Sequence, residues 1–234
     1  MKNIFLEAYE FYTNHMRSVI DNYDNHSGHG DRRRQCQTVI DSINNDFNFD
    51  KVIVLETGSS SSYDDGLFGL FLGYIALKTG GKMISVDLSS DVSKKSEKIF
   101  KDVIPDLDYS LNVGDSISFL NELEEIPNLV HLDSWDLNLF DILPSALHGW
   151  EEFKAIQSKM KKGSVIIIDD NFPKNTGLQW VYTDGRVETM TVNYPMIGKG
   201  AHIYQQVISD KTDWKLIGTH YDCANNIKII IQKQ

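Results

Sequence analysis

The fold of this chain is decided by residues 51–88, which read KVIVLETGSSSSYDDGLFGLFLGYIALKTGGKMISVDL. An apolar run over 52–55 leads into a loop of small residues over 57–62, and an apolar segment of helical length follows over 67–77. After a Gly-Gly turn, a second apolar run covers 83–86. This order predicts a strand, a tight loop, a helix and a second strand. Because a right-handed helical crossover joins parallel strands, we expect both strands to lie parallel in one sheet.

Both strands of this unit end in residues that suit a small-molecule ligand. In an open parallel sheet, ligands bind outside the carboxyl ends of the strands. Gly58 and the serines beside it let a ligand approach the backbone closely, and Asp87 is placed to accept hydrogen bonds from a ribose diol. The loop does not match the dinucleotide fingerprint G-x-G-x-x-G or the phosphate-binding P-loop, because the further glycines and the Gly-Lys-Ser/Thr are missing. The unit therefore predicts a pocket for a nucleoside-type cofactor.

The rest of the chain repeats this unit and then changes character. Strand-like segments at 109–113, 129–132 and 165–168 alternate with helical segments, which predicts three further parallel strands. Residues 214–220 and 227–231 read as two closing strands, and their short connection requires an antiparallel pair. We expect an α/β fold with a Rossmann-like, doubly wound sheet of seven mostly parallel strands, a C-terminal antiparallel pair and helices on both faces.

A single domain is expected to cover the whole chain, 1–234, with two additions. Residues 1–45 predict a helical cap and a polar loop, and the helix over 32–43 is expected to pack beside the first strand. An Asp-Gly turn at 184–185 between two strand-like runs predicts a β-hairpin. We therefore expect residues 175–197 to form an insertion near the active site.

Composition argues against several kinds of partner. The formal net charge of -10 and the pI of about 5.1 argue against nucleic acid as the main partner, because nucleic-acid binding leaves a basic footprint. Cys36 and Cys223 form no C-x-x-C pair, and no apolar run approaches the roughly 18 residues of a membrane span. The N-terminal segment carries charges that a signal peptide lacks, so we expect a cytoplasmic protein that binds no membrane. Its amphipathic helix is compatible with a homodimer.

Acidic or small polar residues follow all of the expected parallel strands. They stand where each run ends, as Glu56-Thr57-Gly58, Asp87, Asp115-Ser116, Asp133 and Asp169-Asp170. Because the carboxyl ends of parallel strands share one edge of the sheet, we expect these side chains to gather there. Solvation alone does not account for such a coincidence at every strand, so this edge is expected to carry the chemistry.

Three of these strand ends resemble the motifs of class I S-adenosylmethionine-dependent methyltransferases. LETGSS at 55–60 resembles the first motif, whose loop holds the methionine end of the cofactor. ISVDL at 84–88 resembles the second, whose acid binds the ribose hydroxyls, and NVGDSISFL at 112–120 resembles the third, which flanks the adenine. The resemblance implies that S-adenosylmethionine is bound by Glu56, Thr57, Gly58, Ser59, Ser60, Asp87, Asp115, Ser116 and Asp133.

A narrower resemblance concerns a metal ion. GSVIIIDD, at 163–170, resembles the metal-binding segment of catechol-type and sugar O-methyltransferases. It implies a divalent site, with Mg²⁺ as the expected ion, held by Asp133, Asp169 and Asp170, because carboxylate oxygens suit an octahedral ion of this kind. The ion would bind adjacent hydroxyls of the acceptor and lower the pKa of one of them.

The catalytic base is open at this point. The catechol enzymes carry a lysine base three positions after the first aspartate, where this chain has Asp136. The candidates are therefore Asp136 and His148, whereas His131 reads as a core histidine. Trp135 is a candidate for the wall of an acceptor pocket, and Trp180 and Tyr182, in the expected hairpin, are the better candidates.

The first hypothesis for function is an S-adenosylmethionine-dependent methyltransferase. It would use Mg²⁺ to assist O-methylation of a small hydroxylated acceptor, such as a sugar or another secondary metabolite. Two alternatives stay open. One is a metal-independent N- or O-methyltransferase, in which the aspartates bind an amine or act as a plain base. The other is a non-catalytic scaffold that binds S-adenosylmethionine.

Overall fold

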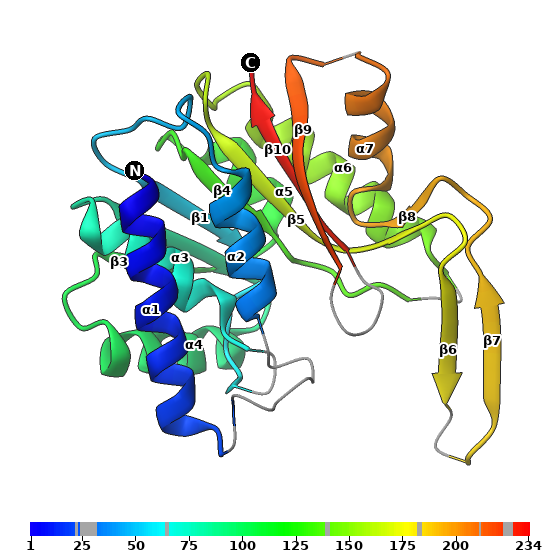
Figure 1. Cartoon of the computed structure of the whole chain (residues 1–234), viewed down its shortest axis with the longest axis horizontal. Helices are drawn as coiled ribbons and strands as arrows, with labels where there is room; N and C mark the ends of the chain where they lie inside the picture. Colours follow the sequence, from blue (N-terminus) through cyan, green and yellow to red (C-terminus); the bar gives the residue numbers. More distant parts are fainter. Residues whose placement is uncertain are drawn as a thin grey trace.

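A computed structural model of the chain describes residues 1–21, 23, 32–63, 66–138, 141–181, 184–210, 212–221 and 227–234 (Figure 1). The helices are α1 (Lys2–Val19), α2 (Arg33–Ser42), α3 (Phe68–Lys78), α4 (Ser90–Val103), α5 (Ser116–Glu122), α6 (Leu143–Gln157) and α7 (Ala201–Ile208). The strands are β1 (Ile53–Thr57), β2 (Lys82–Asp87), β3 (Tyr109–Val113), β4 (Leu129–Leu132), β5 (Val165–Pro173), β6 (Gly177–Val181), β7 (Val187–Thr191), β8 (Met196–Gly198), β9 (Trp214–Tyr221) and β10 (Ile227–Lys233).

The main sheet has the strand order β3-β2-β1-β4-β5-β10-β9. Strands β1 to β5 run parallel, and β10 runs antiparallel to both β5 and β9. The far end of β5 also pairs with β8. The chain moves outward from β1 to β3 and then returns to build β4 on the other side of β1, so the switch point lies between β1 and β4. This architecture confirms the expected Rossmann-like, mostly parallel sheet with an antiparallel C-terminal pair.

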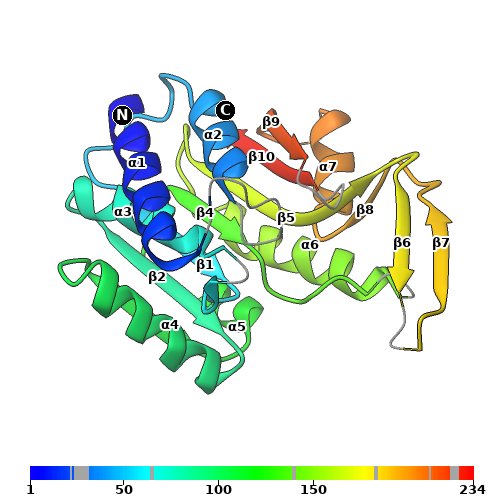
Figure 2. The same cartoon turned by 60° about the horizontal axis from the view of Figure 1, so that its bottom comes forward.

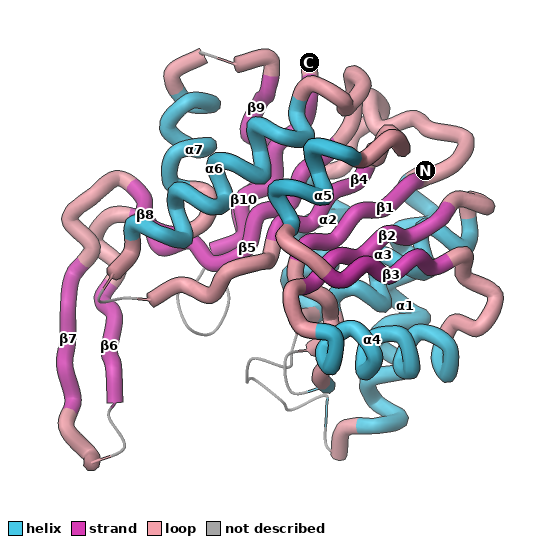
Figure 3. The backbone as a smooth tube through the Cα atoms, turned by 180° about the vertical axis from the view of Figure 1, so that it is seen from behind, coloured by secondary structure: helices cyan, strands magenta, loops and turns pink. Residues whose placement is uncertain are grey.

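Two separate apolar cores flank the sheet, because successive side chains of a strand point to opposite faces. One core joins α1, α2, α3 and α4 to Val54 and Ile167, and the other joins α5, α6 and α7 to Leu55 and Ile166. Figure 1 shows α1 and α2 in front of the sheet, and Figure 3, drawn from behind, shows α5 and α6 in front of it. The strands are therefore covered on both faces by helices.

Helix α2 packs in a different place from the one expected. It lies against β9 and β10, where its buried residues Cys36 and Val39 share a core with Ile230. The first strand is covered by α3 instead. The expectation that this helix packs beside the first strand was wrong, because an amphipathic pattern shows that one face is buried but not which strand buries it.

Strands β6 and β7 form the expected two-stranded hairpin, and all of β7 is exposed. The hairpin projects away from the main sheet beyond β5 and β8 in Figures 1 and 2. Leu178, Val192 and Ile197 form a small apolar cluster at its base. Among the described helices, none has both the length and the apolar character needed to cross a membrane.

Candidate cofactor and acceptor site

The loop after β1 is wedged between the ends of its two neighbouring strands. Gly58 has a φ of 78°, and its N–H donates to the carbonyl of Val86 at 2.9 Å. On the other side, the N–H of Asp133 donates to the carbonyl of Thr57 at 2.9 Å. A Cβ atom at position 58 would lie 2.5 Å from the carbonyl oxygen of Asp133. Glycine is therefore required here by both the backbone conformation and the space.

The carboxylate of Glu56 binds this loop through hydrogen bonds. Its side chain is fully buried, and its carboxylate accepts hydrogen bonds from the Ser60 hydroxyl at 2.7 Å and from the Ser60 N–H at 3.2 Å. The Ser85 hydroxyl donates to the same carboxylate at 3.3 Å. A buried carboxylate needs such donors, because an unpaired buried charge is strongly destabilising. These contacts fix the path of the loop from Thr57 to Ser60.

Asp87 is the last residue of β2, and its carboxylate accepts hydrogen bonds from the loop after β1 and from the turn after β2. Its Oδ2 accepts from the N–H of Ser59 at 2.9 Å, and its Oδ1 accepts from the N–H of Ser89 at 2.7 Å. Each carboxylate oxygen can accept more than one hydrogen bond, so both keep acceptor capacity for a ligand. Asp87 therefore offers free acceptor capacity at the carboxyl end of β2.

A cavity of about 260 Å³ lies over these strand ends. It is lined by Gly58, Val86, Asp87, Leu88, Gly114, Ser116, Asp133, Ser134, Trp135, Asp136 and His148. Four of the predicted cofactor-binding residues and both candidate bases thus contribute to one wall. The other predicted cofactor residues, Glu56, Thr57, Ser59, Ser60 and Asp115, are not in that lining.

His148 lies at the centre of a polar network beside this cavity. Its Nε2 is 3.1 Å from the Ser116 hydroxyl and 2.9 Å from the Ser134 hydroxyl. The Ser134 hydroxyl also donates to the buried carboxylate of Glu152 at 2.6 Å. The ring centroids of Trp135 and His148 are 5.2 Å apart. The backbone of Trp135 has the uncommon φ of 58°. Such strained residues cluster at functional sites, and Trp135, a predicted pocket aromatic, lines the cavity.

Asp115 has a different role from its neighbour Ser116. It is the N-cap of α5, where its Oδ2 accepts the N–H of Ser118 at 2.8 Å. These hydrogen bonds hold the pKa of the Asp115 carboxyl below its ordinary value. The side chain is exposed and lies at the start of the helix whose first residue, Ser116, does line the cavity.

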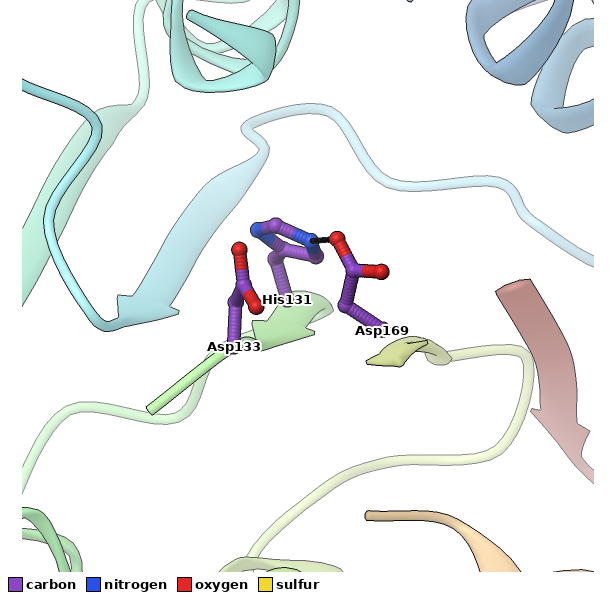
Figure 4. A group of neighbouring side chains, drawn as sticks. All are labelled: His131, Asp133 and Asp169. Carbon is purple, nitrogen blue, oxygen red and sulfur yellow. Dashed lines mark ion pairs between the residues drawn. The ribbon is translucent and has the colours of Figure 1, made fainter. Parts of the chain in front are cut away.

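Asp133 and Asp169, two of the three predicted metal ligands, lie beside His131 (Figure 4). The ligand atoms of these three residues are all within 4.8 Å of one another. His131 is buried as predicted, but its Nδ1 is 3.7 Å from Glu56 Oε1 and its Nε2 is 3.8 Å from Asp169 Oδ2. Neither ring nitrogen has a hydrogen-bond partner among the described residues. His131 is therefore part of an acidic cluster and not only a core residue.

Two buried lysines, which the sequence analysis missed, meet the same aspartates. Lys228 forms an ion pair with Asp169. Lys199 lies 2.6 Å from Asp133 Oδ1 and 2.8 Å from Asp170 Oδ2. Burial alone would raise the pKa of Asp133, but Lys199 and other nearby cations hold this pKa well below its ordinary value. Burial would lower the pKa of Lys199, but the two aspartates raise it instead.

These lysines decide how well the cluster fits Mg²⁺. Each of the three aspartates already has an ammonium group as its counter-charge. Arg32 also lies 3.7 Å from Asp169, so the three carboxylates are balanced by three cations, and a divalent ion would add uncompensated positive charge. The nitrogen of His131, the remaining donor, suits transition metals better than Mg²⁺. The residues therefore do not fit the Mg²⁺ site that the resemblance implied.

The other predicted acceptor-site aromatics lie in the hairpin. Tyr182 falls outside the described residues, and Trp180 is described only by its backbone, which pairs with Glu188. The lysines could have been found by one signal. Lys199 stands between glycines in the apolar segment PMIGKGAHIY, and Lys228 interrupts the apolar run IKIII. When an apolar run is buried in the fold, a charged residue inside it needs an opposite charge beside it. A lysine inside such a run therefore indicates a buried ion pair.

No protein-family model and no curated protein matches this sequence. Its structure does resemble solved structures. An S-adenosylmethionine-dependent methyltransferase from Clostridium acetobutylicum ATCC 824 is 12% identical with a TM-score of 0.52, over 96% of this chain and 96% of that chain. The glycopeptide N-methyltransferase MtfA, complexed with S-adenosyl-L-homocysteine, is 11% identical with a TM-score of 0.52, over 95% of this chain and 97% of that one.

A third similar structure is the O-methyltransferase TomG from Streptomyces achromogenes, in complex with S-adenosylmethionine. It is 10% identical with a TM-score of 0.52, over 78% of this chain and 73% of that chain. At such low identity the likeness establishes the fold alone. This chain has the Rossmann-like fold of S-adenosylmethionine-dependent methyltransferases.

Proposed function

We propose that this chain is an S-adenosylmethionine-dependent methyltransferase that acts on a small-molecule acceptor. One observation carries the proposal. The cavity at the switch point is lined, in the order of the chain, by Gly58 after β1, Asp87 at the end of β2 and Ser116 after β3. These are the residue types that a nucleoside-bearing cofactor needs at these positions: close backbone approach, a ribose acceptor and a polar edge. The likeness in fold to proteins solved with this cofactor or its product supports the same reading.

The cofactor is proposed to lie with its nucleoside in the cavity. Its ribose hydroxyls donate to Asp87, and its adenine lies between Ser116 and the Trp135–His148 side of the wall. The methionine part then passes over Gly58, which leaves the sulfonium methyl near Asp133. In this arrangement His148, whose Nε2 is already within reach of two serine hydroxyls, belongs to adenine binding and not to proton removal.

The chemistry is a single displacement. A lone pair on an oxygen or nitrogen of the acceptor attacks the methyl carbon, and the carbon–sulfur bond breaks with its electron pair left on sulfur. The products are the methylated acceptor and S-adenosylhomocysteine, and the proton of the attacking group goes to a base or to water. The main tasks of the protein are therefore to hold acceptor and methyl in line and to accept that proton.

Asp136 is the proposed proton acceptor. It lines the cavity two residues after Ser134, and its exposed carboxylate has room to meet an entering acceptor. Asp133 suits this task less well, because its lowered pKa makes it a weak base. The side chains of Asp133 and Asp170 are 24% and 28% exposed, so both remain partly accessible. They are proposed to bind hydroxyl or amine donors of the acceptor, without a metal ion.

The test is product formation with a panel of small acceptors. The protein is incubated with S-adenosylmethionine and with polyols, sugars, phenols or amines, in buffer that contains a chelator. Mass spectrometry should find a product heavier by one methyl group, formed in equal amount with S-adenosylhomocysteine. Asp136→Asn should slow this formation without weakening binding of S-adenosylhomocysteine. An Asp136→Asn variant as fast as the parent protein would refute this choice of base.

A further inference from the structure

Lys199 is held in place by an unusually constrained loop. Gly198 has a φ of 110°, and a Cβ atom there would collide with the carbonyl oxygen of Asp170. The N–H of Lys199 donates to that same carbonyl at 3.2 Å, and the N–H of Gly200 donates to Asn171 Oδ1 at 2.6 Å. The backbone on both sides of Lys199 is therefore tied to the end of β5.

Asn171 is committed to this attachment. Its side chain is fully buried, and the two N–H groups of its amide are shared among the carbonyls of Ile168, Asp169 and Ile227, each 2.9–3.2 Å from Nδ2. The amide thus joins β5, β10 and the loop of Lys199 in one network. A buried network that is fully satisfied is rigid and fixes a unique arrangement.

The result is a fixed cation between two carboxylates. The Lys199 side chain is 2% exposed, and its ammonium lies within 2.8 Å of an oxygen of both Asp133 and Asp170. These aspartates come from different strand ends, after β4 and within β5. One cation that binds two carboxylates from neighbouring strands is the arrangement that a divalent ion would otherwise provide.

We infer that Lys199 is an internal cation that takes the place of a metal ion in this site. It acts through Asp133 and Asp170 and is a positioning residue, since its buried ammonium does not reach the acceptor itself. It fixes the two carboxylates at the spacing that an acceptor with two hydrogen-bond donors, such as a vicinal diol or an amino alcohol, can span. The inference rests on the proposed function for its role in catalysis, but its charge balance can be tested without any acceptor.

The first test is a titration of the metal-stripped protein with Mn²⁺ alone, followed by electron paramagnetic resonance. The parent protein should bind no Mn²⁺ at this site. Lys199→Met removes the ammonium that lies between the two carboxylates, so this variant should bind Mn²⁺ measurably where the parent binds none. Lys199→Arg keeps the charge and should remain without Mn²⁺.

Lys159→Met is the matched control. Its ammonium donates to the carbonyls of Leu120, Asn121 and Leu123 at the end of α5, away from the aspartates. It should change neither Mn²⁺ nor S-adenosylhomocysteine binding. Stoichiometric Mn²⁺ binding by the parent protein that disappears in Asp133→Asn would overturn the inference. A folded Lys199→Met variant that gains no Mn²⁺ affinity would overturn it too, and Lys199→Gln serves if Lys199→Met does not fold.

A second readout separates this inference from the proposed function. Lys199→Met should bind S-adenosylhomocysteine within about threefold of the parent protein, because Asp87 and Ser116 are untouched. Its kcat should fall by about 10²-fold, the usual effect of losing one preorganised charge, with part of the rate restored in Lys199→Arg. A parent protein that binds no S-adenosylhomocysteine would refute the proposed function and leave the Mn²⁺ result to decide the role of Lys199. Unchanged kcat in Lys199→Met would refute the positioning role alone.

Discussion

Gly58 meets the backbone of Asp133 so closely that a single methyl group at position 58 would lie 2.5 Å from the Asp133 carbonyl oxygen. This contact joins the cofactor loop after β1 to the end of β4, where the acceptor is proposed to bind. The relative position of the two half-sites therefore depends on the absence of one side chain.

Gly58→Ala should destabilise the fold by about 1–3 kcal/mol, because the strained φ and the steric overlap both have to be relieved. It should also weaken binding of S-adenosylhomocysteine, since the loop has to move. Gly80→Ala is the matched control, because Gly80 also has a positive φ, of 62°, but has no atom within 4 Å of the added methyl group. Chemical denaturation of both variants measures the difference, and equal losses would show that the contact with Asp133 has no effect.

Asp87→Asn should lower the affinity for S-adenosylhomocysteine by about 10- to 100-fold, because hydrogen bonds to a charged group contribute about 1.5–3 kcal/mol. Asp91→Asn, in the first turn of α4, is the control and should leave the affinity unchanged, since the Asp91 side chain is 85% exposed. Isothermal titration calorimetry gives both values. If Asp87→Asn bound as tightly as Asp91→Asn, the ribose would have to lie elsewhere.

His148→Gln and Asp136→Asn should separate binding from catalysis. His148→Gln disturbs the network with Ser116 and Ser134, so its dissociation constant for S-adenosylhomocysteine should rise several-fold. Asp136→Asn should leave that constant unchanged and lower kcat by about 10²-fold, as expected for loss of a general base. Steady-state kinetics and calorimetry on the two variants provide the comparison. The opposite pattern, with kcat lost in His148→Gln and affinity lost in Asp136→Asn, would reverse the two roles.

Asp115→Ala should destabilise the protein by about 1 kcal/mol at neutral pH, the usual effect of losing an N-cap. The pKa of Asp115 is lowered in the folded state, so its stabilisation is present above the unfolded pKa, near 4, and is lost as the pH falls through the folded value. The difference in unfolding free energy between parent and Asp115→Ala should therefore shrink as the pH falls below about 4. Urea denaturation at pH 7 and pH 3 measures this, and a difference that grows in acid would contradict the capping role.

Much of the fold could be predicted because local pattern and sheet chemistry agree. The segments predicted at 109–113 and 129–132 match β3 and β4 in their bounds, since each is a short strand-like segment that ends at a polar residue or a glycine. The Asp-Gly turn likewise predicted the hairpin of β6 and β7. In the site, Gly58 and Asp87 could be placed near one another, because the carboxyl ends of parallel strands lie at the same edge of the sheet.

The charge balance of the site could not be predicted in the same way. Lys199 and Lys228 are buried in the site but were not assigned to it, because a sequence does not show which distant segments meet. Lys199 reaches Asp133 across 66 positions, through the pairing of β8 with β5. The aspartates therefore read as metal ligands as long as their lysine partners were unknown. The packing of α2 on β9 and β10 was missed for the same reason, because it is a long-range contact.

Binding of S-adenosylhomocysteine by the metal-stripped protein, measured in the presence of a chelator, is the most direct test of the proposed function. We predict one binding site per chain by calorimetry, with an affinity that chelator does not change and that Asp87→Asn reduces. A folded protein that gives no binding heat and no thermal stabilisation with S-adenosylhomocysteine would contradict the proposed function. Binding that appears only after Mg²⁺ is added would contradict a site in which Lys199 replaces the metal ion.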